Sequence, residues 1–372
     1  SYCLSAYVTV EYQFDLFALF IEKSVQLARP DGFVSMITPN VWLNNLSNRK
    51  LRRYLLGRTS LRSIADYSRV NVFHRATVLP IVFVLQPQTP AAGSQVAVLK
   101  ASREDAPSLS HHIPQQAWMD DGDAIVNVDL QVDDIPVRRK IAEGGVPLEE
   151  WADVKFGIKL YETGKGDPPQ TPEDAKAHVY EASHQLDDTY RPYLEGKDIE
   201  RYATNWQDRW LKYGKCLAAP RDPALFEGDR LLVRRIVGER LLATRVDEPY
   251  VTSQLLQIVR PKRPLPTTNF VLGILNSELM AWYFRRKYNR QDRTFPEIRI
   301  YELAALPIRP IDFSDPADVA RHDRMVALVQ TMLDLHRRLP EAANPKTRDS
   351  LQRRIADTDR EIDRLVYELY DL

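Results

Sequence analysis

The order of apolar and polar residues predicts a compact α/β segment over the first 86 residues. Apolar side chains recur at helical spacing from Phe14, and Pro30 ends that run. Short apolar runs bounded by polar turns then predict strands, with a second helix that ends at Gly57. The predicted elements are a helix at 14–29, a strand at 33–37, a helix at 45–56, and strands at 61–67 and 77–85. This order is typical of the closing half of a Rossmann-like α/β sheet.

The rest of the chain divides into three predicted segments. Residues 87–150 are polar and irregular, which favours a connector. Residues 151–310 are rich in aromatics, arginines and short apolar runs broken by Gly and Pro, which predicts an irregular α+β domain. Residues 311–372 carry apolar side chains at three-four spacing, interrupted at Asn344-Pro345. We therefore expect a helical hairpin as the tail.

A candidate site follows the strand at 33–37. Thr38, Pro39 and Asn40 occupy the carboxyl end of that strand, where open parallel sheets bind ligands. The alternative is a turn whose proline and asparagine only shape the loop. A doubly wound sheet needs more strands than this segment supplies, so we expect an exposed apolar edge and face. A missing N-terminal part, in the same polypeptide or on another chain, would complete it.

Composition excludes several classes of protein. The 51 basic residues balance the 51 acidic ones, so any charge signal is local. Two cysteines are too few for a disulfide framework or a cysteine zinc site, and they favour a reducing cytoplasm. No apolar run reaches the roughly 18 residues of a membrane span. We expect a protein without a metal site and without a membrane partner.

A local basic surplus points to nucleic acid. Between Arg230 and Arg299 there are 14 basic residues against 6 acidic ones, with tyrosine and phenylalanine interleaved. Such residues neutralise phosphates, and the aromatic rings suit nucleic acid. The alternative is a solvated basic face. The candidate DNA-binding residues in this region are Arg234, Arg235, Arg285, Arg286, Lys287, Arg290 and Arg293.

Three loops between 161 and 197 carry ambiguous motifs. Lys165 lies between two glycines that permit close backbone approach to phosphate, and a plain loop is the equal alternative. Residues 167–170, Asp-Pro-Pro-Gln, contain two successive prolines, which favours a loop. Residues 195–197, Glu-Gly-Lys, imitate a nuclease Glu-x-Lys element with Asp187 or Asp188 as its acidic partner. A metal nuclease needs acidic groups held together on a rigid core, so this function is not favoured.

Longer stretches show a family resemblance. Two of them resemble the back half of the catalytic domain of TaqI-like adenine-N6 DNA methyltransferases: DLFALFIEKSVQLARPDGFVSMITPNVWLNN and RVNVFHRATVLPIVFVL. Others look like the target-recognition domain of that family: KFGIKLYETGKGDPPQ, YLEGKDIERY, LLVRRI, GILNSELMAWYFRRKY and ELAALPIRPI. The closing DREIDRLVYELYDL is similar to the helical tail of such enzymes, including those fused to a restriction nuclease. Together these stretches cover nearly the whole chain.

The resemblance implies site-specific adenine-N6 methylation of double-stranded DNA in a restriction-modification or phage-defence system. It implies that the target adenine is flipped out and that Phe73 stacks on it, with Thr38, Pro39 and Asn40 as the active-site edge. A core phenylalanine that opens a strand is the alternative for Phe73.

The resemblance also implies what this chain does not carry. Family members have a glycine-rich S-adenosylmethionine loop and an Asn-Pro-Pro-Tyr-type motif, and neither occurs here. Asp-Pro-Pro-Gln at 167–170 imitates the second motif, but it has glutamine where an aromatic ring must stack on adenine. The cofactor would be bound mainly by residues upstream of this chain, so we expect the chain alone to be inactive. A non-catalytic DNA-specificity module or subunit is the alternative function, and an RNA methyltransferase is a weaker one.

Overall fold

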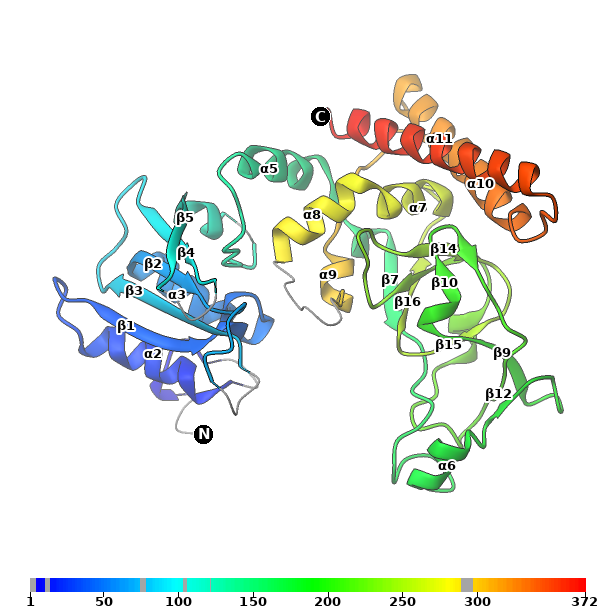
Figure 1. Cartoon of the computed structure of the whole chain (residues 1–372), viewed down its shortest axis with the longest axis horizontal. Helices are drawn as coiled ribbons and strands as arrows, with labels where there is room; N and C mark the ends of the chain where they lie inside the picture. Colours follow the sequence, from blue (N-terminus) through cyan, green and yellow to red (C-terminus); the bar gives the residue numbers. More distant parts are fainter. Residues whose placement is uncertain (1–4, 11–13, 74–77, 103–105, 121, 289–296) are drawn as a thin grey trace. The chain divides into compact units, whose positions relative to one another are not determined.

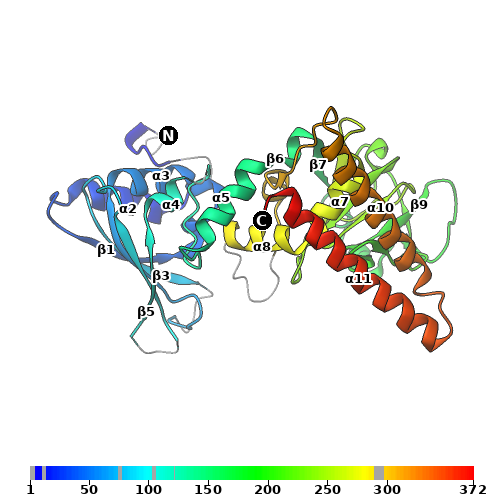
Figure 2. The same ribbon diagram turned by 90° about the horizontal axis from the view of Figure 1, so that it is seen from above.

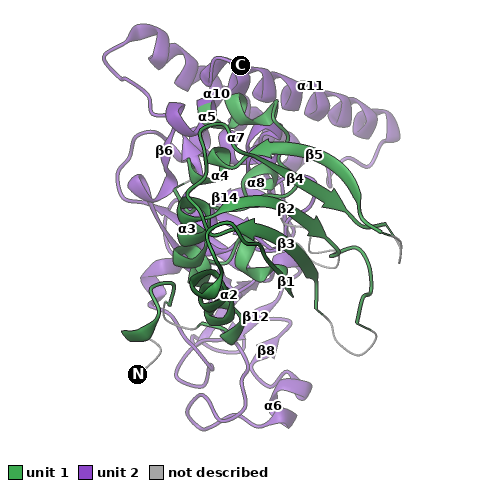
Figure 3. Cartoon of the chain, turned by 90° about the vertical axis from the view of Figure 1, so that its left-hand side faces the viewer, with its two compact units in different colours: residues 1–139, 285–289 green, residues 140–284, 290–372 purple. Residues whose placement is uncertain are grey.

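The computed structural model describes residues 5–10, 14–73, 78–102, 106–120, 122–288 and 297–372. They form a mixed α/β fold with several sheets and C-terminal helices (Figure 1). The chain divides into two compact units, which Figure 3 distinguishes by colour. Unit 1 comprises residues 1–139 and 285–289, and unit 2 comprises residues 140–284 and 290–372. No helix in the described ranges is long and apolar enough to cross a membrane.

Unit 1 is built on a five-stranded sheet of order β1-β3-β2-β4-β5. Both β1 and β2 pair antiparallel with β3, β4 lies parallel to β2, and β5 is antiparallel to β4. The elements are α2 (Leu16–Leu27), β1 (Val34–Pro39), η1 (Asn40–Leu43), η2 (Leu46–Asn48), α3 (Arg49–Arg58), β2 (Ser60–Asp66), β3 (Pro80–Gln86), β4 (Gln95–Lys100), β5 (Ser108–Pro114) and α4 (Gln116–Met119). The sheet is mixed, but β1, β2 and β4 share one direction, so their carboxyl ends lie at the same end of it. The Rossmann-like assignment stays a prediction.

Helices α2, α3 and α4 cover one face of this sheet (Figure 2). The apolar periodicity explains the packing, since Ile21, Val25, Leu51 and Leu55 lie in one buried cluster with the inward residues of the strands. The expected end of the second helix at Gly57 is wrong. That helix runs through Gly57 to Arg58, because a glycine inside a helix costs only about 1 kcal/mol.

The opposite face and the β1 edge of the sheet are apolar and open within the described residues. The side chains of Ile37, Val82 and Leu99 on that face are exposed or half-buried. In the described part of the chain, β1 pairs with β3 alone, so its other edge presents free backbone groups.

Unit 2 contains two four-stranded sheets, ordered β14-β13-β16-β7 and β15-β9-β12-β8, and two small ladders. Its strands are β6 (Val146–Pro147), β7 (Ala152–Phe156), β8 (Glu181–Ala182), β9 (Tyr190–Leu194), β10 (Ile199–Glu200), β11 (Ala203–Thr204), β12 (Trp210–Lys212), β13 (Arg230–Arg234), β14 (Ala243–Val246), β15 (Val251–Thr252), β16 (Leu256–Pro261) and β17 (Pro307–Ile308). A buried cluster that includes Tyr193, Phe226 and Ile258 joins residues of both larger sheets.

The longer helices of unit 2 follow its two four-stranded sheets in the chain. The helices of unit 2 are η3 (Leu148–Glu150), α6 (Pro172–Ala177), η4 (Gly196–Asp198), η5 (Pro223–Phe226), α7 (Thr268–Asn276), α9 (Ile300–Ala304), α10 (Pro316–Arg338) and α11 (Pro345–Leu369). Two more, α5 (Asp134–Gly144) and α8 (Glu278–Tyr288), contain a boundary between the units. The expected C-terminal helices are confirmed as α10 and α11, which pack on each other. The break between the two helices ends at Asn344, whose side chain caps α11.

Ion pairs fasten the last helix to the strands of unit 2. Arg201 forms a two-bond pair with Asp359, and Arg240 pairs with Asp363 at 2.8 Å. Asp363 also accepts a hydrogen bond from the backbone N–H of Glu278. These half-buried pairs span more than 80 residues of sequence, so they set the position of α11 within the unit.

Candidate active-site edge and nucleic-acid interface

The end of β1 presents one free amide beside a fixed turn. Thr38 is buried, and its hydroxyl accepts a 3.0 Å hydrogen bond from the Trp42 indole. Asn40 donates its backbone N–H to the Leu79 carbonyl at 2.8 Å, while its half-buried side chain makes no hydrogen bond to the described residues. Thr38 therefore supports the turn, and the Asn40 amide is available to a ligand.

A buried arginine holds this turn in place. The Arg52 guanidinium is fully buried and donates to the Trp42 carbonyl at 2.8 Å and the Asn45 carbonyl at 2.6 Å. It also donates to the carbonyls of Asp123 and Ala124. Sequence reasoning missed Arg52, because an arginine within a helix does not show whether it faces solvent.

Phe73 lies in the loop that joins β2 to β3, and its side chain is 43% exposed. The strand register pairs Pro39 with Pro80 and Asp66 with Ile81. The loop that carries Phe73 therefore leaves the sheet at the end where β1 stops. The predicted active-site edge and the predicted stacking residue thus arise from the same end of one sheet.

The same end of the sheet carries a buried carboxylate that sequence reasoning also missed. Asp66 ends β2, is 3% exposed, and accepts the Ser68 N–H at 2.9 Å. The Lys100 ammonium at the end of β4 lies 3.0 Å from Asp66 and 2.6 Å from Asp129. Burial acts to raise the pKa of Asp66, but the Ser68 hydrogen bonds and the Lys100 charge outweigh it and hold the pKa below its usual value.

Several predicted DNA-binding residues form ion pairs with other side chains of the protein. Arg235 pairs with Glu297 at 2.8 Å and lies 5.6 Å above the Phe156 ring. Arg286 pairs with Asp134 at 3.1 Å. Arg230, part of the counted surplus, is fully buried and donates to backbone carbonyls, and burial lowers its pKa to about 10. The surplus of basic residues therefore overstates the cations that face solvent.

The remaining predicted residues differ in exposure. Lys165 and Arg285 are exposed, and Arg234 is half-buried at the end of β13. The Lys287 ammonium lies 5.2 Å from the centre of the Tyr288 ring. Arg290 and Arg293 lie outside the described residues. The role of each in DNA binding stays a prediction.

The ambiguous loops of unit 2 have structural explanations. The Gln170 side chain is buried, donates to the carbonyls of Leu160 and Cys216, and accepts the Glu162 N–H, so its amide is used in holding the loop. Gly166 has a φ of 86°, and a Cβ there would collide with the Cys216 carbonyl. This loop therefore needs its glycine for packing.

The Glu195 carboxylate pairs with Arg209 and Lys197 in a small ion-pair cluster. Within the described ranges, no group of three or more His, Cys, Asp or Glu side chains is arranged to hold a metal ion.

The chain thus consists of an α/β segment followed by a β-rich domain. Some arginines of that domain form ion pairs within the protein, and others face solvent. Residues 1–73 match the Eco57I restriction-modification methylase family, and residues 191–308 match the TaqI-like C-terminal specificity domain. One segment of the chain is therefore similar to a restriction-modification methylase, and a second segment is similar to a TaqI-like specificity domain.

One curated protein and one solved structure show how far the sequence and fold of this chain resemble those of known proteins. The "Putative type II restriction enzyme and methyltransferase RM.MjaORFECS2P" of Methanocaldococcus jannaschii is 22% identical over 314 residues, which cover 80% of this chain and 25% of that protein. The solved structure of the Type IIL restriction-modification enzyme MmeI in complex with DNA matches with a TM-score of 0.62 and 12% identity, over 99% of this chain and 51% of that one. The chain thus spans a quarter of the curated relative and about half of MmeI.

Proposed function

We propose that the protein carrying this chain is a site-specific DNA adenine-N6 methyltransferase of a restriction-modification or phage-defence system. In this proposal unit 1 supplies one end of the active site and unit 2 recognises the DNA sequence. The observation that carries the proposal is the combination, in one chain, of a methylase segment and a specificity domain. Acting on cellular DNA, such a protein would work in the cytoplasm.

The catalytic part of the proposal rests on the end of the sheet. An exocyclic amine inside a duplex is reached only after its base is swung out, and the extruded base needs an aromatic face. Phe73 is exposed on a loop at that end, which suits stacking better than a core role. The free Asn40 amide at the same end supplies a donor and an acceptor for the edge of a base.

S-adenosylmethionine would supply the methyl group, but the described residues of unit 1 do not fit this cofactor. Its glycines, Gly32, Gly57, Gly93 and Gly122, lie singly in turns or within a helix, and none forms a strand-to-helix glycine loop. We therefore propose that residues outside this chain bind the cofactor.

The open side of unit 1 supports a completing partner. The unpaired edge of β1 and the apolar face beside Ile37 suit further strands and helices. On α2, Leu16 and Phe20 are 67% and 64% exposed, which adds apolar surface. We propose that the rest of a methyltransferase domain, in the same polypeptide or on another chain, packs here.

Duplex DNA is the proposed partner of unit 2. The solved MmeI structure is a complex of that enzyme with DNA, and the present chain shares its fold. Exposed cations such as Lys165, Arg191 and Arg221 in unit 2 would contact phosphates or bases.

The test is to incubate the full-length protein with S-adenosylmethionine and duplex DNA, and to analyse the digested nucleosides by mass spectrometry. N6-methyladenine at one sequence is the expected product. Methylcytosine as the sole product would refute the adenine assignment. Sequence-specific binding without any methylation would favour the alternative, a DNA-specificity module, which is supported by the longer match of the specificity domain.

A further inference from the structure

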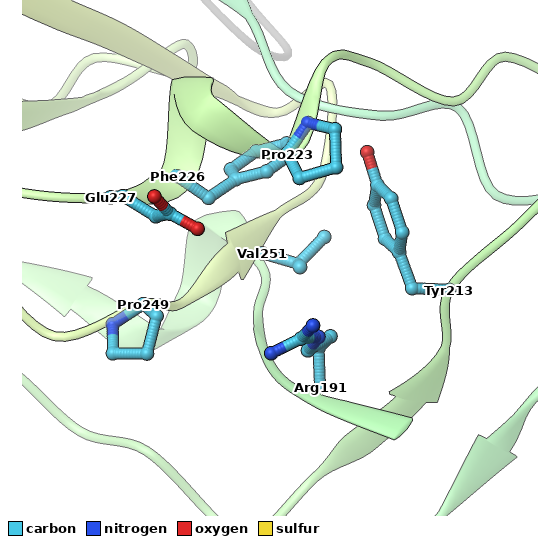
Figure 4. A pocket seen from close by; sticks show the side chains of 7 residues that line it. All are labelled: Arg191, Tyr213, Pro223, Phe226, Glu227, Pro249 and Val251. Atoms are coloured by element: carbon cyan, nitrogen blue, oxygen red, sulfur yellow. The ribbon is translucent and has the colours of Figure 1, made fainter. Parts of the chain in front are cut away.

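A pocket in unit 2 brings a cation and a carboxylate together on apolar walls. It is lined by side chains from separate elements: Arg191 on β9, Tyr213 after β12, Phe226 on η5, Glu227 beyond η5, and Val251 on β15. Figure 4 shows the Arg191 guanidinium and the Glu227 carboxylate facing one space, with the Tyr213 ring at its side. All of these residues lie within the segment that matches the TaqI-like specificity domain.

The two charged groups are not used in holding the fold. Arg191 and Glu227 are exposed, and neither side chain has a hydrogen bond or ion pair within the described part of the chain. This contrasts with Arg235 and Arg209, which are tied to Glu297 and Glu195. The donors of Arg191 and the acceptors of Glu227 are therefore available to a ligand.

The walls of the pocket are held rigidly. The Tyr213 hydroxyl donates to the Arg221 carbonyl, and its ring packs edge-on against Phe226 at 6.1 Å. Asp222 caps η5 by accepting the Ala224 N–H at 3.0 Å. Val251 lies on a strand that pairs with β9. Fixed walls give the pocket its shape before any ligand arrives, which lowers the entropy cost of binding.

We propose that this pocket recognises one base pair of the DNA target in the major groove, and that it selects G·C. Arg191 would donate two hydrogen bonds to guanine O6 and N7, and Glu227 would accept one from the cytosine N4 amino group. This inference rests on the proposed function, because it names the residues by which the specificity domain would recognise sequence.

The chemistry of the opposed groups explains the selection. An A·T pair in the same orientation would place the adenine amino donor against Arg191 and the thymine O4 acceptor against Glu227. Adenine N7 would still accept one hydrogen bond from Arg191, but the adenine amino group would face a donor and thymine O4 would face a carboxylate, and both of those contacts are repulsive. A well-formed bidentate contact of this kind discriminates between bases by about 5- to 150-fold.

The test selects bound duplexes from a randomised DNA pool with the full chain, and compares the wild type with Arg191→Ala, Arg191→Lys and Glu227→Gln. We expect the wild type to fix one position as G·C, and Arg191→Ala to lose that preference by about 5- to 150-fold while other positions are unchanged. Arg191→Lys keeps the charge but not the bidentate fork, so it should lose most of the same preference. Arg353→Ala, which removes an exposed arginine of α11 far along the chain, is the matched control and should change nothing.

The outcomes separate the two proposals. A wild-type chain that selects a sequence, with variants that select the same one, overturns the role of the pocket and leaves the proposed function standing. A uniform loss of affinity for all sequences in Arg191→Ala also overturns it, because that result identifies a phosphate contact. A wild-type chain without any sequence preference overturns the proposed function and this inference with it. Melting temperatures equal to that of the wild type exclude misfolding as the cause of a changed preference.

Discussion

Replacing Phe73 by alanine in the full-length protein should separate base stacking from packing. Stacking of an extruded base on an aromatic ring is worth about 1–3 kcal/mol, so its loss should slow methylation of a paired duplex by about 5- to 150-fold. Affinity for DNA should barely change, because phosphate contacts dominate it. A mismatched adenine is already partly unstacked, so the variant should recover part of its activity on a mismatched duplex.

The exposure of Phe73 sets the expected change in stability. Loss of a fully buried phenylalanine side chain costs about 3–5 kcal/mol. Because Phe73 is 43% exposed, we expect at most about 3 kcal/mol for its removal. Phe83→Ala is the matched control, because Phe83 is fully buried and packs edge-on against Trp42 at 5.8 Å. That variant should show the full cost, and no rescue by a mismatch.

The assay combines single-turnover methylation of paired and mismatched duplexes with thermal unfolding of each variant. Equal loss of rate on both duplexes would show that Phe73 does not stack on the flipped base. Destabilisation of Phe73→Ala by as much as Phe83→Ala would identify Phe73 as a core residue instead.

Four other measurements test DNA binding, cofactor binding and the buried charges of unit 1. Duplex-DNA affinity should fall steeply with salt, with a slope of log affinity against log salt of about −4 to −7, and a flat response in a filter-binding titration would contradict phosphate binding. The isolated chain should show no micromolar affinity for S-adenosylmethionine by calorimetry, because the glycine-rich loop is absent from its sequence. Arg52→Met should cost at least about 2 kcal/mol in thermal unfolding by leaving buried carbonyls unpaired, whereas Arg53→Met, on the exposed side of α3, should have little effect. Asp66→Asn should destabilise the protein at neutral pH, because the folded pKa of Asp66 lies below its usual value of 3.8. The stabilisation by the Asp66 carboxylate is complete above about pH 5 and is lost as the pH falls through the folded pKa. The melting temperatures of the variant and the wild type should therefore converge in acid.

The local sequence predicted the helices and strands of the first 86 residues and the two C-terminal helices, but it missed β4 and β5, which lie in the expected connector and belong to the five-stranded sheet. Apolar periodicity placed α2, β1, β2 and β3 within a few residues, because each element buries one face and that face recurs at a fixed spacing. The break at Asn344-Pro345 placed the start of α11, since a capping side chain followed by proline is a local signal. The resemblance to restriction-modification methyltransferases also came from ordered local stretches, and the family matches confirm it.

Only the tertiary structure decided which charges are free. Arg235 and Glu297 are separated by 62 residues and Arg240 and Asp363 by 123, so no local pattern shows that these arginines are paired. The direction of β3 between β1 and β2 is likewise set by non-local pairing. The pocket lined by Arg191 and Glu227 forms because β9, β15, η5 and the segment after β12 converge there. Spacing along the chain determines which face an element buries, whereas the partner of a charged side chain depends on where distant segments meet, and that is decided by packing.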